Sequence, residues 1–416
     1  MLLIYNLATR LYFILIRVAS AFSPKAKKLY SGQRAATSEL RNYFDTGTDM
    51  NPIWIHAASL GEFEQGRPII ESIKSQYPKT KILLTFFSPS GYEVRKNYSQ
   101  ADIVTYLPFD TPANAKAFLD ITRPQLAIFV KYEFWYHYIS AAHAAKVPLI
   151  SISTIFKPSQ PFFKFYGALH RSMLVKFDHF FVQNDQSLHL LQSIGVANGI
   201  VSGDTRYDRV IDISAKQPDL AIIDQFIGDE RVIVVGSSWP SDIDLIKDGL
   251  HRAMDSAKII IAPHNVDEVT VSDLLDEFPG SVCYSGTQSS DLTSNRVMVI
   301  DNVGMLSSLY GYADIAYVGG GARGALHNTL EPATWGIPII FARHEKNNKF
   351  EEALDLMQNG GAFEVSTAED FNSQLILLLS NQDKREAAGT QARKQVQDNA
   401  GATRIIMNYL INKIDV

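Results

Sequence analysis

Glycines and polar side chains in residues 319–338 have the types and spacing that suit a phosphate. The stretch reads GGGARGALHNTLEPATWGIP and follows an apolar segment, 315–318. Consecutive glycines at the end of a strand let the backbone approach a ligand closely, and a helix start just beyond favours an anion. Gly319, Gly321 and Gly324 also form a GxGxxG pattern. A lone match of this kind also arises in a tight turn that only packs a helix on a sheet.

Polar residues follow these glycines where the loop is expected to become a helix. They are His327, Asn328 and Glu331. A carboxylate at this place, four residues from an imidazole, suits the hydroxyls of a ribose better than it suits a core. For His327, a helix-capping role is an equal alternative. We expect Gly320 and Gly321 to bind the same substrate as these three side chains.

Further polar residues stand where other predicted strands end. The first half offers His56, Ser59 and Glu62 after one strand, and Glu133 after another. Glu62 opens a predicted helix, where an acid simply complements the helix dipole. The dipole lowers the pKa of such an acid, which opposes a role as general base, whereas burial raises it. The sequence does not decide between these effects.

The second half offers Ser237, Ser238 and His264 after its predicted strands. His264 could be a satisfied core histidine, but it follows a strand and a proline, which favours a loop that reaches a ligand. Asp242 and Asp244 form a DxD-like pair at a helix start, where capping explains them. We therefore assign no metal.

The elements that must position these residues alternate between strand and helix. Apolar segments rich in β-branched residues predict buried strands, and amphipathic segments between them predict helices. Such alternation predicts parallel sheets covered on both faces, and ligands of these sheets bind beyond the carboxyl ends of the strands. We predict two Rossmann-like domains that face a cleft. The principal predicted strands are 53–56, 81–87, 126–130, 232–235, 258–262, 297–300, 315–318 and 337–341.

Length and composition support this division. The 416 residues, 46% hydrophobic and 20% charged, are too many for one ordinary core. We expect an anchor and basic linker at 1–38, one domain at 39–208, a second at 209–402, and a final helix at 403–416 that packs back across the junction. Cys283 is the only cysteine, which excludes a disulfide within the chain and fits a reducing compartment.

The amino-terminal segment combines basic and apolar residues. The first 38 residues carry +6 and the rest of the chain −11, within a net charge of −5. Arg10 and Arg17 interrupt the apolar run, which favours an interfacial or shallowly inserted anchor over a spanning helix. The cluster from Lys25 to Arg34 would meet anionic headgroups on the cytoplasmic side. The alternatives are a signal peptide, because 19–21 resembles a cleavage site, and a helix that packs on its own domain.

Several motifs resemble those of the bacterial 3-deoxy-D-manno-oct-2-ulosonic acid (Kdo) transferases. WIHAASLGE, which contains Gly61, resembles the family signature WIHAVSVGE, and YEFW at 132–135 resembles TELW. ADIAYVGGG and HNTLEPATWGIPIIF resemble ADVAFVGG and HNPLEPAALGKPVLF, and APH at 262–264 is similar to the family's PRH. The resemblance extends over nearly the whole chain.

The resemblance implies a GT-B glycosyltransferase on the cytoplasmic face of the inner membrane. Such enzymes transfer Kdo from CMP-Kdo to a lipid A precursor with inversion, without a bound metal or other cofactor and without a nucleic-acid partner. By the same resemblance Glu62 is the proposed base and Glu133 a second essential carboxylate. His264, Asn328 and Glu331 match positions that contact CMP.

Three departures from the family pattern concern the details of substrate contact. Lys131 replaces a carboxylate, APH lacks the arginine of PRH, and STIFKPSQ stands in place of NARLSERS. Lys157 in that last segment could take over the role of an arginine, although an exposed lysine is its simpler interpretation. The alternative functions are another GT-B nucleotide-sugar transferase or epimerase, and a non-catalytic membrane-bound protein that binds a nucleotide sugar.

Overall fold

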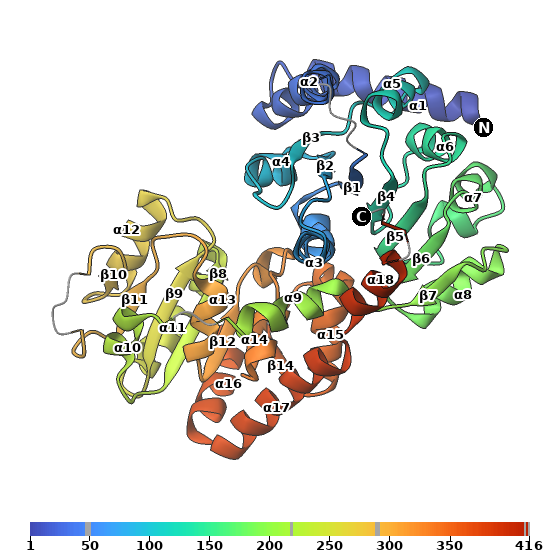
Figure 1. Cartoon of the computed structure of the whole chain (residues 1–416). Helices are drawn as coiled ribbons and strands as arrows, with labels where there is room; N and C mark the ends of the chain where they lie inside the picture. The colour runs from blue at the N-terminus through green and yellow to red at the C-terminus, as the bar shows by residue number, and fades with distance from the viewer. Residues whose placement is uncertain (46–50, 217–218, 288–291, 412, 415–416) are drawn as a thin grey trace. The chain divides into compact units, whose positions relative to one another are not determined.

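Two parallel β-sheets organise the chain (Figure 1). The computed structural model describes residues 1–45, 51–216, 219–287, 292–411 and 413–414. The chain divides into two units. Unit 1 comprises Met1–Asp208 and Ala400–Val416, and unit 2 comprises Arg209–Asn399.

The sheet of unit 1 has seven strands in the order β3-β2-β1-β4-β5-β6-β7. Its central strands β1, β2 and β4 are buried along their whole length because helices cover both faces. The strands are β1 (Ile53–Ala57), β2 (Ile82–Phe86), β3 (Ile103–Tyr106), β4 (Leu126–Val130), β5 (Leu149–Thr154), β6 (His179–Val182) and β7 (Gly199–Val201).

The helices of unit 1 come from both ends of the chain. The carboxyl-terminal helix α18 packs on α3, and its residues Ile406, Met407 and Leu410 are buried in one cluster with Ile69 and Ile70 of α3. The helices are α1 (Leu2–Ala19), α2 (Pro24–Phe44), α3 (Leu60–Gln76), α4 (Pro89–Arg95), α5 (Pro112–Thr122), α6 (Tyr136–Ala144), α7 (Ala168–Leu174), α8 (Asp185–Ser193) and α18 (Ala402–Leu410), with α9 (Thr205–Ser214) running from unit 1 into unit 2.

The sheet of unit 2 has seven strands in the order β10-β11-β9-β8-β12-β13-β14. After β11 the chain returns to the other side of β8, so the strand order reverses between β8 and β12. Ligands of open parallel sheets bind at such a point. The strands are β8 (Val232–Ser238), β9 (Lys258–Pro263), β10 (Val282–Cys283), β11 (Val297–Val299), β12 (Ile315–Val318), β13 (Ile339–Ala342) and β14 (Ala362–Val365).

The helices of unit 2 follow its strands in alternation. The short α14 ends at Gly336, whose φ of 73° provides a left-handed cap. The helices are α10 (Ala221–Ile227), α11 (Pro240–Ala253), α12 (Glu268–Glu277), α13 (Leu306–Leu309), α14 (Leu330–Trp335), α15 (Glu351–Gln358), α16 (Ala368–Ser380) and α17 (Gln382–Asp398).

Helix α1 leaves most of its surface uncovered within unit 1. Ile16 is its one buried residue, and the helix is long and apolar enough to cross a membrane by length and composition. It is nevertheless attached to its own domain by polar contacts. Tyr5 Oη donates to Asp110 Oδ2 at 2.5 Å, and Asn6 Oδ1 lies 2.6 Å from His137 Nε2. The helix thus has an exposed apolar surface and is held on unit 1 by specific polar contacts.

Candidate functional site

Two carboxylates of unit 1 lie close to each other at the carboxyl edge of its sheet. Glu62 is in the first turn of α3, directly after β1, and Glu133 lies in the loop between β4 and α6. The pKa of Glu133 is raised to about 7, first by burial and then by the charge of Glu62, while Lys131 opposes the rise. The structure therefore brings together the two acids that the sequence singled out.

The loop that holds Glu133 turns sharply at Lys131, whose φ is 68°. The amide of Lys131 donates to the carbonyl of Ile152, and its own carbonyl accepts from the hydroxyl of Ser151. Lysine rarely adopts the left-handed conformation, so these bonds to β5 stabilise the turn. These two hydrogen bonds therefore fix the point at which the loop leaves the sheet.

His56 does not face a ligand, contrary to its predicted role in substrate binding. The residue is fully buried, and burial lowers its pKa to about 3, so the ring is neutral. Trp135 Nε1 donates to His56 Nε2 at 3.2 Å, and His56 Nδ1 lies 3.0 Å from Thr85 Oγ1. Because Nε2 accepts, the proton is on Nδ1 and is donated to Thr85. Both nitrogens are thus used inside unit 1, and His56 orients Trp135.

An aromatic row leads from this histidine to the amino-terminal helix. The ring of Trp135 stacks on Phe87 at 4.7 Å, and Phe87 stacks on Tyr12 of α1 at 6.3 Å. The pKa of Tyr12 is raised by burial and by the charge of Glu133. Helix α1 therefore reaches the immediate surroundings of the acid pair. The sequence alone did not indicate this link, because it joins residues 12, 87 and 135 through tertiary packing.

The other predicted residues of unit 1 are Ser59, Gly61 and Lys157, and they differ in their contacts with the acid pair. The Ser59 hydroxyl donates to the carboxylate of Glu62. Gly61 is exposed, and a Cβ at this position would find open space apart from Ser59 Oγ. Lys157 is exposed in the loop after β5, and among the described residues it forms no ion pair with Glu62 or Glu133. Only Ser59 thus touches one of the two acids.

In unit 2 the glycine turn is held by a buried carboxylate, Asp242. Its Oδ2 accepts from the amides of Trp239 at 3.0 Å and Gly320 at 2.8 Å, and its Oδ1 accepts from the hydroxyl of Tyr317 at 3.1 Å. The expectation that the amides of the turn point at an anion is therefore not met for Gly320. The predicted capping role of Asp242 is confirmed, and it extends to the glycine turn.

The glycines of this turn are required by close packing. Gly320 has a φ of 81°, and a Cβ there would clash with the carbonyl of Ala325. A Cβ on Gly321 would likewise clash with the backbone of Ala342. These contacts support the tight-turn interpretation of the glycines, which the sequence left open beside phosphate binding.

Four side chains stack beside the turn, and two of them, Trp239 and Arg323, were not singled out from the sequence. The guanidinium of Arg323 lies 4.1 Å from the ring centre of Trp239, Trp239 stacks on His264 at 4.2 Å, and His264 stacks on His327 at 4.7 Å. Trp239 Nε1 also donates to His327 Nε2 at 3.2 Å. The two predicted histidines are thus brought together by Trp239.

Both histidines of the stack favour the neutral form. The pKa of His327 is lowered to about 4, first by burial and then by His264, while Asp242 opposes the fall. Burial and then Arg323 lower the pKa of His264. The fixed positive charge in this group of rings is therefore that of Arg323. Sequence reasoning missed this residue, although the GGGARG motif contains it and arginine is the usual partner of a phosphate.

The remaining predicted residues of unit 2 surround the same turn. Asn328 Nδ2 donates to Glu331 Oε1 at 3.1 Å, while Asn328 Oδ1 accepts from the amide of Leu330. Ser237 has a φ of 53° at the end of β8. Ser238 is buried, and its hydroxyl has no hydrogen-bond partner among the described residues. These positions agree with a site at the reversal of strand order.

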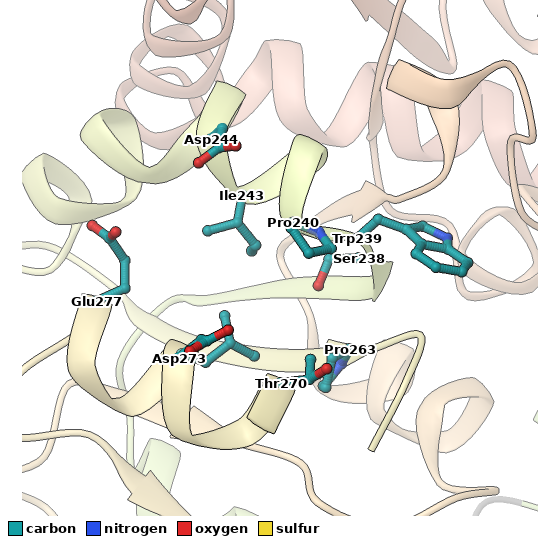
Figure 2. Close-up of a pocket in the computed structure, with 10 residues that line it drawn as sticks. Ser238, Trp239, Pro240, Ile243, Asp244, Pro263, Thr270, Asp273 and Glu277 are labelled. Atoms are coloured by element: carbon teal, nitrogen blue, oxygen red, sulfur yellow. The ribbon is translucent and has the colours of Figure 1, made fainter. Parts of the chain in front are cut away.

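A hollow of about 200 Å³ opens at the carboxyl ends of β8 and β9, between α11 and α12 (Figure 2). Ser238 and Pro263 end the two strands, and Asp244, Asp273 and Glu277 add carboxylates to the wall. The indole of Trp239 extends away from the other labelled side chains in Figure 2. An acidic hollow of this kind repels a phosphate, so the ring stack rather than the hollow is the better place for an anion.

Comparisons with known proteins agree with the motifs. Residues 26–209 match the family model for 3-deoxy-D-manno-octulosonic-acid transferase (kdotransferase). The 3-deoxy-D-manno-octulosonic acid transferase of Aquifex aeolicus is 28% identical over 79% of this chain and 86% of its own length. The enzyme of the same name from Haemophilus influenzae is 26% identical over 86% of each chain.

Solved structures share the two-sheet architecture. UDP-GlcNAc 2-epimerase from Neisseria meningitidis, bound to UDP-GlcNAc, has a TM-score of 0.60 and 17% identity, with 87% of this chain and all of that chain covered. MurG from Acinetobacter baumannii has a TM-score of 0.52 and 14% identity, with the same shares covered. These likenesses show the fold, and the sequence relatives show the activity. The chain is therefore similar to the Kdo transferases over most of its length, and it is a glycosyltransferase with the GT-B fold.

Proposed function

We propose that this protein transfers Kdo from CMP-Kdo to a hydroxyl of a lipid A precursor, with inversion at the anomeric carbon. The observation that supports this most is the acid pair of unit 1, in which the pKa of Glu133 is raised to about 7 beside Glu62. Two carboxylates that interact in this way do not both ionise readily at neutral pH. One of them therefore holds a proton when the other is charged.

The acid pair of Glu62 and Glu133 explains where the proton of the acceptor hydroxyl goes. The acceptor hydroxyl oxygen forms a bond to the anomeric carbon while the bond from that carbon to the CMP phosphate oxygen breaks. Glu62, which the family motif designates as the base, takes the hydroxyl proton. Glu133 stays protonated in the same step and so leaves Glu62 as the single negative charge.

The donor is proposed to bind to the glycine turn and the ring stack of unit 2. Arg323 supplies the positive charge for the phosphate in place of the arginine that APH lacks, since it lies on Trp239 beside His264. Glu331, tied to Asn328, is placed to accept from ribose hydroxyls. As CMP leaves, Arg323 stabilises its phosphate charge. No metal or other cofactor is invoked.

The lipid acceptor places the reaction at a membrane, and α1 is the proposed attachment. Its exposed apolar residues include Leu3, Ile4, Leu7 and Leu11. The basic residues that follow in α2 favour the cytoplasmic leaflet of the inner membrane, which presents anionic headgroups. Because Tyr12 stacks on the row that ends at Trp135, the acceptor headgroup would reach the acid pair directly from the lipid surface.

Product analysis tests the proposal. Purified full-length protein is incubated with a lipid A precursor and either CMP-Kdo or a UDP-sugar, and the lipid product is examined by mass spectrometry and by NMR of the new anomeric centre. We expect lipid carrying Kdo only with CMP-Kdo, and an anomeric configuration opposite to that of the donor. Transfer from the UDP-sugar, or binding of CMP-Kdo without turnover, would contradict the proposal.

A further inference from the structure

A second surface of unit 1 exposes aromatic side chains far from α1 in the sequence. Phe165 is 94% exposed and Tyr166 is 49% exposed, and their rings meet edge to face at 5.2 Å. Val175, at the end of α7, is 61% exposed. A fully exposed phenylalanine beside a tyrosine is unfavourable in water, and contiguous apolar surface of this kind marks a contact with a protein or a membrane.

The loop that presents these rings is held firmly from below. Arg171 Nη1 donates to the carbonyls of Phe162 at 3.1 Å and Lys164 at 2.7 Å. The amide of Gly167 donates to the carbonyl of Lys164, and a Cβ on Gly167 would clash with the carbonyl of Pro161. Phe162 is buried in an aromatic cluster. The outward position of Phe165 and Tyr166 is therefore built into the loop.

The same segment is basic throughout. Residues 155–177 contain no Asp or Glu and four Lys or Arg residues, Lys157, Lys164, Arg171 and Lys176. Arg171 is used inside the loop, whereas Lys157 is exposed. Exposed aromatic residues among lysines complement a surface that is apolar within and negatively charged outside. An anionic phospholipid bilayer has this chemistry.

The segment also adjoins the helix that we place at the membrane. Lys176 Nζ lies 5.5 Å from the ring centre of Tyr136, and the ring of Tyr5 in α1 lies 5.7 Å from the same ring. Helix α6, which begins with Tyr136, contacts α7 and is drawn next to it in Figure 1. The end of α7, which follows the exposed loop in the chain, and α1 thus both contact Tyr136.

We propose that Phe165 and Tyr166 form a second membrane contact, which inserts into the headgroup region of an anionic bilayer while α1 occupies its own place there. A single helix leaves unit 1 free to rotate about the helix axis, whereas two separate contacts fix its orientation. The proposal rests on the proposed membrane association of α1. It concerns a different segment, whose role is to orient unit 1 on the membrane.

A tryptophan at position 165 tests the insertion directly. The F165W variant of the full-length protein is mixed with vesicles of phosphatidylethanolamine and phosphatidylglycerol whose acyl chains are brominated or not, with wild-type protein as the background. We expect a blue shift of the added emission and its quenching by the brominated lipid. If the protein sediments with the vesicles but emission from position 165 is neither shifted nor quenched, the second contact is disproved while the role of α1 stands.

Removal of the rings tests their contribution. The double variant F165S/Y166S should bind these vesicles about tenfold more weakly than wild type, as expected for the loss of two interfacial aromatic groups. The matched control is I376S on α16, which removes an exposed apolar side chain of unit 2 and should leave binding unchanged. Transfer to an acceptor in vesicles should fall in the double variant, and transfer to a detergent-solubilised acceptor should not.

The outcomes separate this inference from its rivals. Unchanged vesicle binding in F165S/Y166S, together with a shift from dimer to monomer in sedimentation velocity, would show that a second copy of the chain covers the loop, and it would overturn the proposal. If wild-type protein fails to bind vesicles at all, the proposed membrane association itself is wrong. If wild-type protein binds vesicles and F165S/Y166S binds them more weakly, both the membrane association of α1 and the second contact are supported.

Discussion

The two units place their candidate groups at the same edge of similar sheets but use them in opposite ways. In unit 1 the carboxylates Glu62 and Glu133 are close together, and burial raises the pKa of Glu133 to about 7. In unit 2 the buried carboxylate Asp242 accepts several hydrogen bonds and holds the glycine turn. The difference teaches that a carboxylate bound by several protein donors holds the structure together, whereas a desolvated carboxylic acid beside a second carboxylate can retain its proton and leave the other free to act as a base.

The largest expected effect concerns the base. Glu62→Gln keeps the shape of the side chain but cannot accept the acceptor's proton, so single-turnover transfer should slow by about 10² to 10⁴. Binding of CMP should remain because it depends on unit 2. The control is Glu64→Gln on the same helix, whose carboxylate pairs with Arg67 and Arg95. Near-normal transfer by the Glu62 variant, with a lowered melting temperature, would make Glu62 a structural acid.

Asp242 should behave in the opposite way. Asp242→Asn replaces a carboxylate that accepts hydrogen bonds from Trp239, Gly320 and Tyr317. The NH₂ group of the asparagine side chain is a donor, so it faces at least one of these donors without forming a hydrogen bond. We expect a loss of about 3 kcal/mol of unfolding free energy, together with weaker CMP binding. Asp244→Asn on the same helix is the matched control and should have little effect on either. Equal denaturation midpoints for the two variants would show that Asp242 does not hold the turn.

Glu331 tests ligand binding without proton transfer. Glu331→Ala should weaken CMP by about 1 to 3 kcal/mol, the usual cost of leaving polar partners unsatisfied. Calorimetry with CMP measures this, and circular dichroism checks that the variant is folded. Unchanged affinity in a folded protein would remove Glu331 from the nucleotide site and leave its bond to Asn328 as the only role supported.

The raised pKa of Glu133 predicts a pH dependence of stability. A carboxyl group whose folded pKa lies above its ordinary value of 4.5 binds its proton more tightly in the folded state, so stability falls as pH rises from about 4.5 to about 7. Because Glu133 is partly exposed, we expect about 1 to 2 kcal/mol over this window. Urea denaturation of wild type and Glu133→Gln at pH 5 and 8 measures it. An identical pH dependence in both proteins would contradict the raised pKa.

The smallest effect on the nucleotide site is expected at α1. Replacement of Leu3, Leu7 and Leu11 by serine should release the protein from anionic vesicles because it removes the exposed apolar surface. CMP affinity should stay within about 0.5 kcal/mol of wild type, as for surface substitutions in general. The variant retains Tyr5 and Asn6, so the hydrogen bonds that hold α1 on unit 1 are preserved. Sedimentation with vesicles as strong as that of wild type would show that α1 is not the attachment.

The sequence predicted the regular elements better than the contacts between them. Strands 126–130 and 315–318 agree with the structure to the residue, and 232–235 was predicted three residues too short at its end. These segments are buried on both faces, so their composition alone identifies them. The predicted strand 337–341 begins at Ile339, after Pro338, because proline lacks the amide that the sheet needs.

The candidate site was predictable where its residues stand in motifs and not where tertiary packing decides. Glu62 and Glu133 follow strands of one sheet, so their proximity could be expected from the topology. His56 has the same position at a strand end, yet its ring points into the core and serves Trp135. Sequence patterns do not report the direction of one side chain. Arg323 stands in the GGGARG motif, but its place over the ring of Trp239 is set by tertiary packing, which the sequence does not report.

The packing of α18 on α3 has a consequence for synthesis on the ribosome. Ile406, Met407 and Leu410 lie within nine residues of the last described residue but close the core over Ile69 and Ile70. The first 208 residues therefore emerge without the helix that covers α3, and they must wait until all of unit 2 has been translated. We infer that the nascent chain exposes the isoleucines of α3 for most of its translation, so chaperones have a long opportunity to bind there.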